Sequence, residues 1–306
     1  MGVCELCGSN EGKEVIVKDY NMGGTESFTY WQCSNCGCMS LINKPVDMSK
    51  YYGKAYYSFS LKQGKVKTLM KRRDVYEVRK TGIIGAFMSK FIPRPAYSVI
   101  SEFNDDARIL DVGCGDGYLL YLLREMGYKN LYGCDRFMDN RHDANIDLIK
   151  GGVDVCEGEY DLIMFNHSFE HMDEPLKVLK CSSEKLSKNG KISISIPVAN
   201  SNAYKKYGKY WVQLDAPRHF FIHSVKSIEM LTKQVNLKIE NTIFDSSAFQ
   251  YICSEQYKNG KNGDYRRTWK GIIEYGLLSL FKYSSLAKRD NELKQGDQAT
   301  FVLSKV

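Results

Sequence analysis

One nonapeptide organises the chain: Ile109-Leu110-Asp111-Val112-Gly113-Cys114-Gly115-Asp116-Gly117. Its first four residues are typical of a buried strand, and the glycines predict a tight turn into a helix that begins at Tyr118. Glycine lets the backbone approach a ligand closely, and the first turn of a helix offers free amide groups. The stretch therefore predicts a ligand-binding turn at the carboxyl end of a strand.

The spacing of the glycines narrows the class of ligand. A nicotinamide-binding turn follows G-x-G-x-x-G, which would need a glycine where Tyr118 stands, whereas this chain has acid-x-G-x-G-x-G. Asp111 at the strand end would face the cationic amino group of an amino-acid moiety, so the turn favours such a ligand over a pyrophosphate. Asp135 ends the next predicted strand, where a carboxylate can accept both ribose hydroxyls.

Strands and helices alternate along the rest of the chain. The further predicted strands are 131–135, 161–166, 192–196, 238–245 and 300–304, and the predicted helices are 118–126, 174–187 and 224–234. This order predicts an α/β fold with a mostly parallel sheet and helices on both faces. Ligands of such sheets bind at the carboxyl ends of the strands.

On these residues the chain resembles the class I S-adenosylmethionine-dependent methyltransferases, whose fold is Rossmann-like, over roughly residues 100–306. The residues that match the family's first motif are Asp111, Gly113, Gly115 and Gly117, and Asp135 matches its ribose-binding acid. The resemblance implies S-adenosylmethionine as cofactor and an antiparallel last strand. It also implies that Cys114 lies in the cofactor turn, that Arg136 and Phe137 flank the adenine, and that Asn166 lies by the reacting methyl group.

Two matched cysteine pairs stand near the N-terminus, Cys4-x-x-Cys7-Gly8 and Cys33-x-x-Cys36-Gly37. A tight turn aims both thiolates of a pair at one ion, and two such turns complete a tetrahedral sulfur shell. The spacing predicts a structural zinc site in a ribbon whose strand covers residues 27–32. The redox alternative, a thioredoxin-like pair, would need a βαβ context. Cys38 is a spare with a weaker claim as a ligand.

A tyrosine-rich and basic segment separates the two parts. It holds four tyrosines between Tyr51 and Tyr57, and the residues from Lys50 to Arg94 include twelve basic and two acidic side chains. The tyrosines either pack against the next domain or offer hydroxyls to the cofactor or the substrate, with Tyr57 as the candidate. Residues 62–91 are predicted to be helical, with a basic stripe that is either a solvated face or a phosphate-binding surface. We expect a zinc ribbon at 1–45, this connector at 46–100 and the methyltransferase domain at 101–306.

The candidate acceptor site has two parts. The first is the segment after strand 161–166, where His167, Glu170 and His171 would share one face of a helix. It resembles the E-x-x-E-H segment of ubiquinone O-methyltransferases, whose acids and histidine bind a metal, with His167 in place of the first acid. The resemblance implies a second divalent metal at these residues. One alternative is a general base paired with the acid that orients it. The default interpretation is that the segment is a common feature at the start of a helix.

The second part is the long loop after strand 192–196, with Trp211-Val212-Gln213-Leu214-Asp215-Ala216-Pro217-Arg218-His219. A loop of this length over a site is usually functional. Its Leu-Asp-x-Pro-Arg-His string resembles methyltransferases of bacterial polysaccharide and sugar-tailoring pathways. An alcohol acceptor must lose its proton during methyl transfer, so His219 is a candidate general base, with packing as the alternative.

The leading functional hypothesis is O-methylation of a sugar, either nucleotide-linked or within a surface glycan. The rival is a ribosomal or transfer RNA methyltransferase that uses the ribbon and the basic stripe. A small-molecule natural-product methyltransferase and a non-enzymatic scaffold remain further alternatives. The cysteines are unlike a disulfide framework, and we recognise neither a secretory signal nor a membrane-spanning stretch in the sequence, so we expect a cytoplasmic protein.

Overall fold

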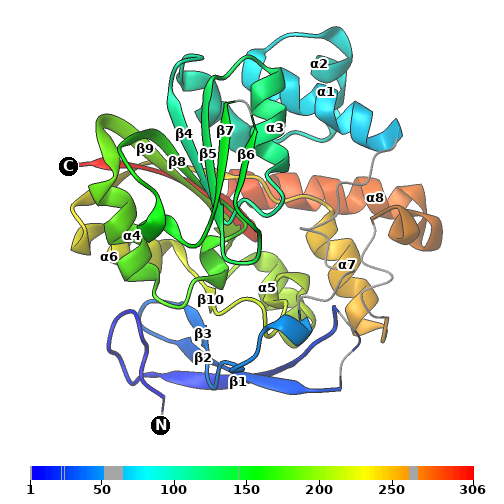
Figure 1. Cartoon of the computed structure of the whole chain (residues 1–306). Coiled ribbons are helices and arrows are strands. Elements are labelled where there is room, and N and C mark those ends of the chain that lie inside the picture. The colour runs from blue at the N-terminus through cyan, green and yellow to red at the C-terminus, as the bar shows by residue number, and fades with distance from the viewer. Residues whose placement is uncertain (1, 22, 24, 52–64, 144, 262–267) are drawn as a thin grey trace.

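The computed structural model describes residues 2–21, 23, 25–51, 65–143, 145–261 and 268–306. These residues form a large sheet of eight strands and a smaller sheet of four (Figure 1). The candidate Tyr57, with most of the tyrosine-rich segment, lies outside the described residues. Within the described residues, no helix is both long enough and apolar enough to span a membrane.

The large sheet has the strand order β11-β12-β9-β8-β4-β5-β7-β6. Its strands are β4 (Arg108–Val112), β5 (Asn130–Asp135), β6 (Arg141–Asp143), β7 (Ile146–Lys150), β8 (Tyr160–Asn166), β9 (Leu186–Pro197), β11 (Leu237–Phe244) and β12 (Gln298–Lys305). The central pairs are parallel, and β12 is antiparallel to both of its neighbours. The predicted α/β class and the antiparallel last strand are confirmed.

Helices cover both faces of this sheet (Figure 1). One face packs against α4 (Pro175–Glu184) and α6 (Val225–Gln234), in a core that includes Leu110, Phe165 and Ile194. The other face packs against α3 (Tyr118–Glu125) and the 3-10 segment Pro95–Glu102. Side chains from neighbouring positions of β4 point to opposite cores, which is why this strand is apolar on both sides.

The structure corrects two of the predicted helices. Residues 62–91 are not one helix, because α1 (Lys65–Arg79) ends before Lys80 and Gly82, which have φ of 54° and 93°, and α2 (Ile83–Phe91) follows. The helix predicted to reach Ser187 ends at Glu184, and Gly190 lies inside β9. A Cβ at Gly190 would lie 2.8 Å from the carbonyl oxygen of Tyr160 on the paired strand. This glycine therefore permits close strand approach rather than ending a helix.

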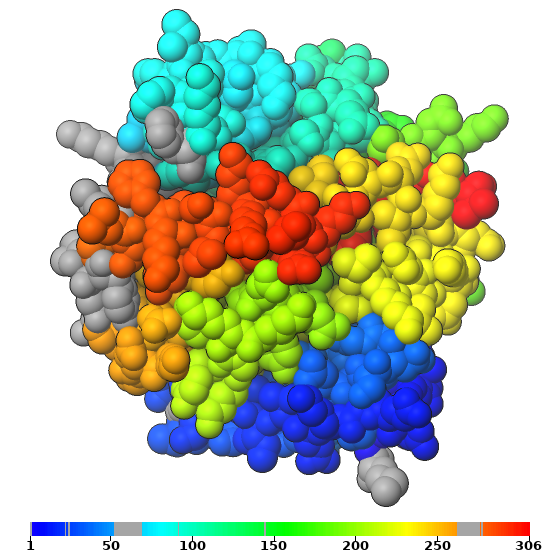
Figure 2. All heavy atoms as spheres, turned by 180° about the vertical axis from the view of Figure 1, so that it is seen from behind, coloured from blue at the N-terminus to red at the C-terminus, as the bar shows by residue number. Residues whose placement is uncertain are grey.

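The small sheet contains a strand from the far part of the chain. It consists of β1 (Gly12–Lys18), β2 (Ser27–Cys33), β3 (Met39–Leu41) and β10 (Phe221–Ile222), all antiparallel. Tyr30 and Met39 share a core with Trp211 and Leu214. Seen from behind, the blue N-terminal residues lie directly against the yellow-green segment of α5 (Asn202–Tyr207) and the turns after it (Figure 2). The first 45 residues are therefore joined to the large domain by a shared sheet and core.

The loop predicted after β9 is largely ordered into short helical turns. It contains α5, the 3-10 turns Gly208–Tyr210 and Val212–Leu214, and then β10. Its apolar side chains are buried rather than spread over the surface. The loop leads into α6, which Ser224 caps, because its hydroxyl accepts from the amide of Ser227. The last helices, α7 (Phe249–Lys258) and α8 (Thr268–Glu292), pack against each other, and α7 also packs against α5 and the 3-10 turns of this loop (Figure 1).

Candidate active site and metal centre

The glycine-rich turn between β4 and α3 adopts a backbone that only glycine takes easily. Gly113, Gly115 and Gly117 have φ of 76°, 57° and 81°. A Cβ at Gly113 would lie 2.4 Å from the Cβ of Ser168, whose hydroxyl donates to the carbonyl of Val112 at 2.5 Å. A side chain at Gly113 would therefore push the turn away from the segment after β8.

Asp135 lies at the carboxyl end of β5 and is held by this turn. One carboxylate oxygen accepts from the amide of Gly115 at 3.0 Å, and the other accepts from the amide of Phe137 at 2.8 Å. The two predicted adenine neighbours lie on the surface beside it. The Phe137 ring is exposed, and the Arg136 guanidinium is 3.6 Å from the carboxylate of Asp173.

Asp111 and Asn166 meet at the carboxyl ends of two adjacent parallel strands. The Asn166 amide donates to Asp111 Oδ1 at 3.1 Å. Burial, together with the charge of Asp135, raises the pKa of the Asp111 carboxyl to about 7, against the opposing effect of the Asn166 hydrogen bond. A nearby cation would restore its ionised form. Cys114 points elsewhere, with its sulfur 3.8 Å from that of Met138, and burial raises the pKa of its thiol.

The two parts of the acceptor site, far apart in sequence, come together around Glu170. Residues Phe169–His171 form a single 3-10 turn rather than a longer helix. Glu170 is buried, its Oε1 lies 3.6 Å from His167 Nδ1 and 3.9 Å from His219 Nε2, and the rings of His171 and His219 are 4.8 Å apart. Glu170, His171 and His219 form a group able to hold a metal ion, in which His219 takes the place predicted for His167.

Backbone carbonyls orient both imidazoles of this group. His171 Nδ1 lies 2.7 Å from the carbonyl of Arg218, and His219 Nδ1 lies 2.8 Å from the carbonyl of Gln213. Because a carbonyl only accepts hydrogen bonds, the network assigns the proton of each neutral ring to Nδ1 and leaves Nε2 as the acceptor. His219 Nε2 lies 3.9 Å from Glu170 Oε1, and each of the two histidines offers one ring nitrogen to the group that contains this carboxylate.

The charge states follow from this arrangement. Burial, and then the neighbouring His171, lowers the pKa of His219 to about 4. Burial alone would raise the pKa of Glu170, but the three surrounding histidines lower it to about 2. At neutral pH Glu170 is therefore a carboxylate and His219 is a neutral imidazole. Both oxygens of Glu170 are buried without a hydrogen-bond partner among the described residues.

A buried ion cluster lies next to the histidines and consists of Arg218, Asp215 and Asp19. Arg218 and Asp215 belong to the loop motif noted in the sequence, and Asp19 does not. The fully buried Arg218 contacts Asp19 at 2.7 and 3.2 Å, and it contacts Asp215 at 2.8 and 3.1 Å. Sequence analysis missed Asp19 because it is 199 residues from its partner. The only signal was a general one, that a buried cation needs an anionic partner.

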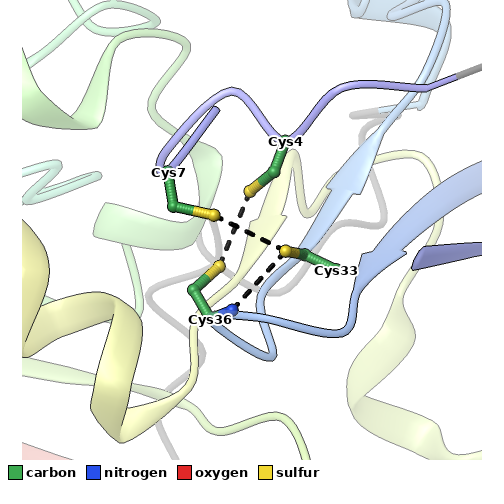
Figure 3. Close-up of side chains that lie close together, drawn as sticks. All are labelled: Cys4, Cys7, Cys33 and Cys36. Carbon is green, nitrogen blue, oxygen red and sulfur yellow. Dashed lines mark hydrogen bonds between the residues drawn. The ribbon is translucent and has the colours of Figure 1, made fainter. Parts of the chain in front are cut away.

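The four predicted zinc ligands converge (Figure 3). Sulfur atoms of Cys4 and Cys36 are 3.5 Å apart, those of Cys7 and Cys33 are 3.6 Å apart, and all four lie within 4.8 Å of one another. A tetrahedral zinc with bonds of about 2.3 Å places its sulfurs about 3.8 Å apart, which this group fits closely. The spare Cys38 lies outside the group.

Comparison with known proteins places this geometry in a family. A family model described as "Methyltransferase domain" matches residues 85–242. A tRNA U34 carboxymethyltransferase of Campylobacter fetus subsp. fetus (strain 82-40) is 24% identical over 173 residues, which cover 50% of this chain and 61% of that protein. The chain thus spans less than two thirds of the length of that curated relative.

Among solved structures, coclaurine N-methyltransferase bound to N-methylheliamine and SAH has a TM-score of 0.48 and 13% identity, covering 86% of this chain and 84% of that one. The cyclopropane synthase MmaA2 from Mycobacterium tuberculosis has a TM-score of 0.46 and 13% identity, covering 75% and 88%. The family match extends over more than half of the chain. The chain therefore belongs to the methyltransferase-domain family.

Proposed function

We propose that this methyltransferase transfers the methyl group to a hydroxyl of a sugar, nucleotide-linked or within a surface glycan. The observation that carries the proposal is the group formed by Glu170, His171 and His219. Glu170 and His171 follow Asn166, the last residue of β8, and His219 comes from the later loop. The Nδ1 atoms of both imidazoles bond to carbonyls, so that Nε2 is left as the acceptor. A hydroxyl acceptor loses its proton during the transfer, and a base at this place can accept it, whereas a neutral amine attacks through its lone pair before it loses a proton.

In this proposal the cofactor lies over the carboxyl ends of β4 and β5. Asp111 faces its amino group, the turn from Gly113 through Cys114 to Gly117 follows its chain, and Asp135 accepts the ribose hydroxyls. Each carboxylate oxygen of Asp135 has a second lone pair beyond the amide bond it accepts. Arg136 and Phe137 flank the adenine, and Asn166 lies by the reacting methyl group.

The proposed role of Asp111 predicts a pH-dependent affinity for S-adenosylhomocysteine. The free carboxyl has a pKa of about 7, and the ligand ammonium favours its ionised form, so binding releases the proton. We expect affinity to be constant well above pH 7 and to fall by up to about tenfold per pH unit below it. Calorimetry from pH 6 to 8 measures this, and the Asp111→Asn variant should bind weakly with no such dependence. A flat wild-type profile would remove Asp111 from the amino-group site.

His219 is the proposed general base, and His171 positions the acceptor hydroxyl. His219 Nε2 lies 3.9 Å from Glu170 and 4.0 Å from Asp215, so both carboxylates stabilise the imidazolium that forms when the proton arrives. The low pKa of the resting ring keeps Nε2 deprotonated until then. Methyl transfer itself is an in-line displacement, to which positioning contributes most.

We expect His219→Gln to lower kcat by about 10² to 10⁴-fold, the usual contribution of a general base, with unchanged affinity for S-adenosylhomocysteine. The assay incubates labelled S-adenosylmethionine with a panel of nucleotide-sugars and glycans. His142→Gln is the matched control, because His142 is exposed on β6 at the far edge of the sheet. A His219→Gln enzyme with wild-type kcat would exclude this base.

RNA methylation is the second candidate, favoured by the curated relative and by the basic stripe. Part of that stripe is neutralised within the protein: Lys71 pairs with Glu125, Arg73 with Asp74, and Arg79 with Asp105. The remaining charge is therefore smaller than the sequence suggests, which favours the sugar. Label that enters ribosomal or transfer RNA and none of the sugars would establish the RNA alternative.

A divalent cation at Glu170, His171 and His219 is the alternative way for this group to work. Metal-bound histidines usually donate the other ring N–H to a carbonyl, as both do here, and the Glu170 oxygens have no hydrogen-bond partner among the described residues. EDTA treatment that leaves one zinc per chain, the one bound by the four cysteines, distinguishes the histidine base from the divalent cation. Unchanged kcat supports the histidine base, and a loss restored by Mg²⁺ or Mn²⁺ supports the metal.

A further inference from the structure

We propose that the N-terminal ribbon is a positioning element of the acceptor site, in which Tyr30 and Asp19 fix the orientation of His219 and His171. This inference rests on the proposed function for the roles of the two histidines. It assigns to the cysteine-bound module a task beyond its own folding.

The backbone provides the first connection. Strand β3 of the ribbon pairs with β10, and the Leu41 amide donates to the carbonyl of Phe220 at 2.8 Å. On the other side, the Phe220 amide donates to the carbonyl of Glu170 at 2.8 Å. Residue 220 is thus held between the ribbon and the turn that carries Glu170, one position after His219.

Tyr30 provides the second connection. It is fully buried in β2, and its hydroxyl donates to the carbonyl of His219 at 2.7 Å. The same hydroxyl lies 3.5 Å from the carbonyl of Leu214, next to Gln213, whose own carbonyl holds His219 Nδ1. One ribbon hydroxyl therefore fixes the backbone of His219 and lies beside the segment whose Gln213 carbonyl sets its tautomer.

Asp19 provides the third connection, to His171. Its carboxylate holds the Arg218 guanidinium through two hydrogen bonds, and the Arg218 carbonyl accepts from His171 Nδ1 at 2.7 Å. Asp19 follows the last residue of β1, so the ribbon sets where Arg218 lies. Each imidazole thus depends on a long-range contact, between Tyr30 and His219 across 189 positions and between Asp19 and Arg218 across 199 positions.

The cysteine group is fixed to the same part of the large domain. Cys33 is the last residue of β2, three positions after Tyr30, and the carbonyl of Cys36 accepts from the hydroxyl of Ser224, the cap of α6. A metal held by the four sulfurs would therefore fix the end of β2, and the cap of α6 holds the adjacent Cys36 through its carbonyl. The tyrosine lies on a strand with little freedom to move.

The test is Tyr30→Phe in the zinc-loaded full chain, since this change removes one hydroxyl and keeps the ring. Nitrogen-15 NMR of the imidazoles should report Nδ1–H tautomers for His171 and His219 in the wild type and mixed tautomers for His219 in the variant. We expect kcat to fall about 10- to 100-fold, as small misplacements of catalytic groups do. Zinc content and affinity for S-adenosylhomocysteine should stay unchanged.

Tyr204→Phe is the matched control. The Tyr204 hydroxyl donates to Gln32 on the same strand β2, so the substitution removes an equivalent bond across the same interface, away from the histidines. Its tautomers and kcat should match the wild type. Asp19→Asn extends the test to His171, whose tautomer it should change.

The inference is overturned if Tyr30→Phe leaves the His219 tautomer and kcat unchanged, or if Tyr204→Phe alters them equally. Its failure is separable from that of the proposed function, because the NMR measurement needs no acceptor. If the tautomers respond as expected while neither sugars nor RNA are methylated, the positioning role stands and the acceptor assignment fails.

Discussion

Asp135→Ala is expected to weaken the binding of S-adenosylhomocysteine by about 100-fold or more. The proposed site gives this carboxylate two ribose hydroxyls, and a hydrogen bond to a charged group is worth about 1.5 to 3 kcal/mol. Two such bonds correspond to about 3 to 6 kcal/mol, and each 1.4 kcal/mol is about tenfold in affinity. The substitution also frees the amides of Gly115 and Phe137, which loosens the turn itself.

Calorimetry with S-adenosylhomocysteine measures this effect, and two variants serve as references. Asp106 is an exposed carboxylate that pairs with Lys129 and precedes the amino end of β4, away from the proposed cofactor site. Asp106→Ala should therefore bind like the wild type. Asp135→Asn keeps the size of the side chain, and its affinity for S-adenosylhomocysteine should lie between those of Asp135→Ala and Asp106→Ala. An Asp135→Ala protein that is folded and binds with wild-type affinity would refute the proposed cofactor site.

The second large effect is expected from Cys36→Ser, which should abolish zinc binding and destabilise the whole chain. Structural zinc contributes about 10 to 16 kcal/mol to the folding of isolated finger peptides, whereas a whole domain is stable by only about 5 to 15 kcal/mol. Because the ribbon shares β10 and a core with the large domain, the loss should not be confined to the first 45 residues. Thermal unfolding should show one transition at a much lower temperature.

Elemental analysis provides the direct measurement, with one zinc per chain in the wild type and none in Cys36→Ser. Cys38→Ser is the matched control, because Cys38 is a buried neighbour outside the sulfur group. It should retain its zinc and its unfolding temperature within a few degrees. Metal-free wild-type protein that unfolds at the same temperature as the loaded protein would contradict a structural role.

Local sequence signals predicted much of the fold and the placement of the proposed cofactor residues. The strand before Gly113 and the acid at position 135 could be recognised because each depends on residues within a few positions of it. The helix predicted to reach Ser187 is too long, because a glycine can follow a helix or allow two strands to approach, and only the neighbouring Tyr160 shows that Gly190 does the latter. Short-range patterns carry no information about such a neighbour.

The acceptor site shows the same limit more strongly. Glu170 and His219 are predicted in different parts of the acceptor site, because the turn and the loop meet only in the folded chain, where Phe220 bonds to Glu170 and His171 bonds to Arg218. Tyr30 and Asp19 were not suspected at all, since a tyrosine in a ribbon strand and an acid after one are common. Their partners lie in the folded chain, about 190 to 200 residues away.

The shared pairing of β3 with β10 makes the ribbon and the acceptor loop a single exchangeable unit. A chimera that kept this ribbon but took residues 198–224 from a relative would pair β3 with a foreign strand and leave Asp19 without Arg218. The acceptor preference of such enzymes would then be inherited only when both segments come from the same parent. Attempts to redirect this enzyme by swapping its loop should therefore transplant residues 1–51 together with it.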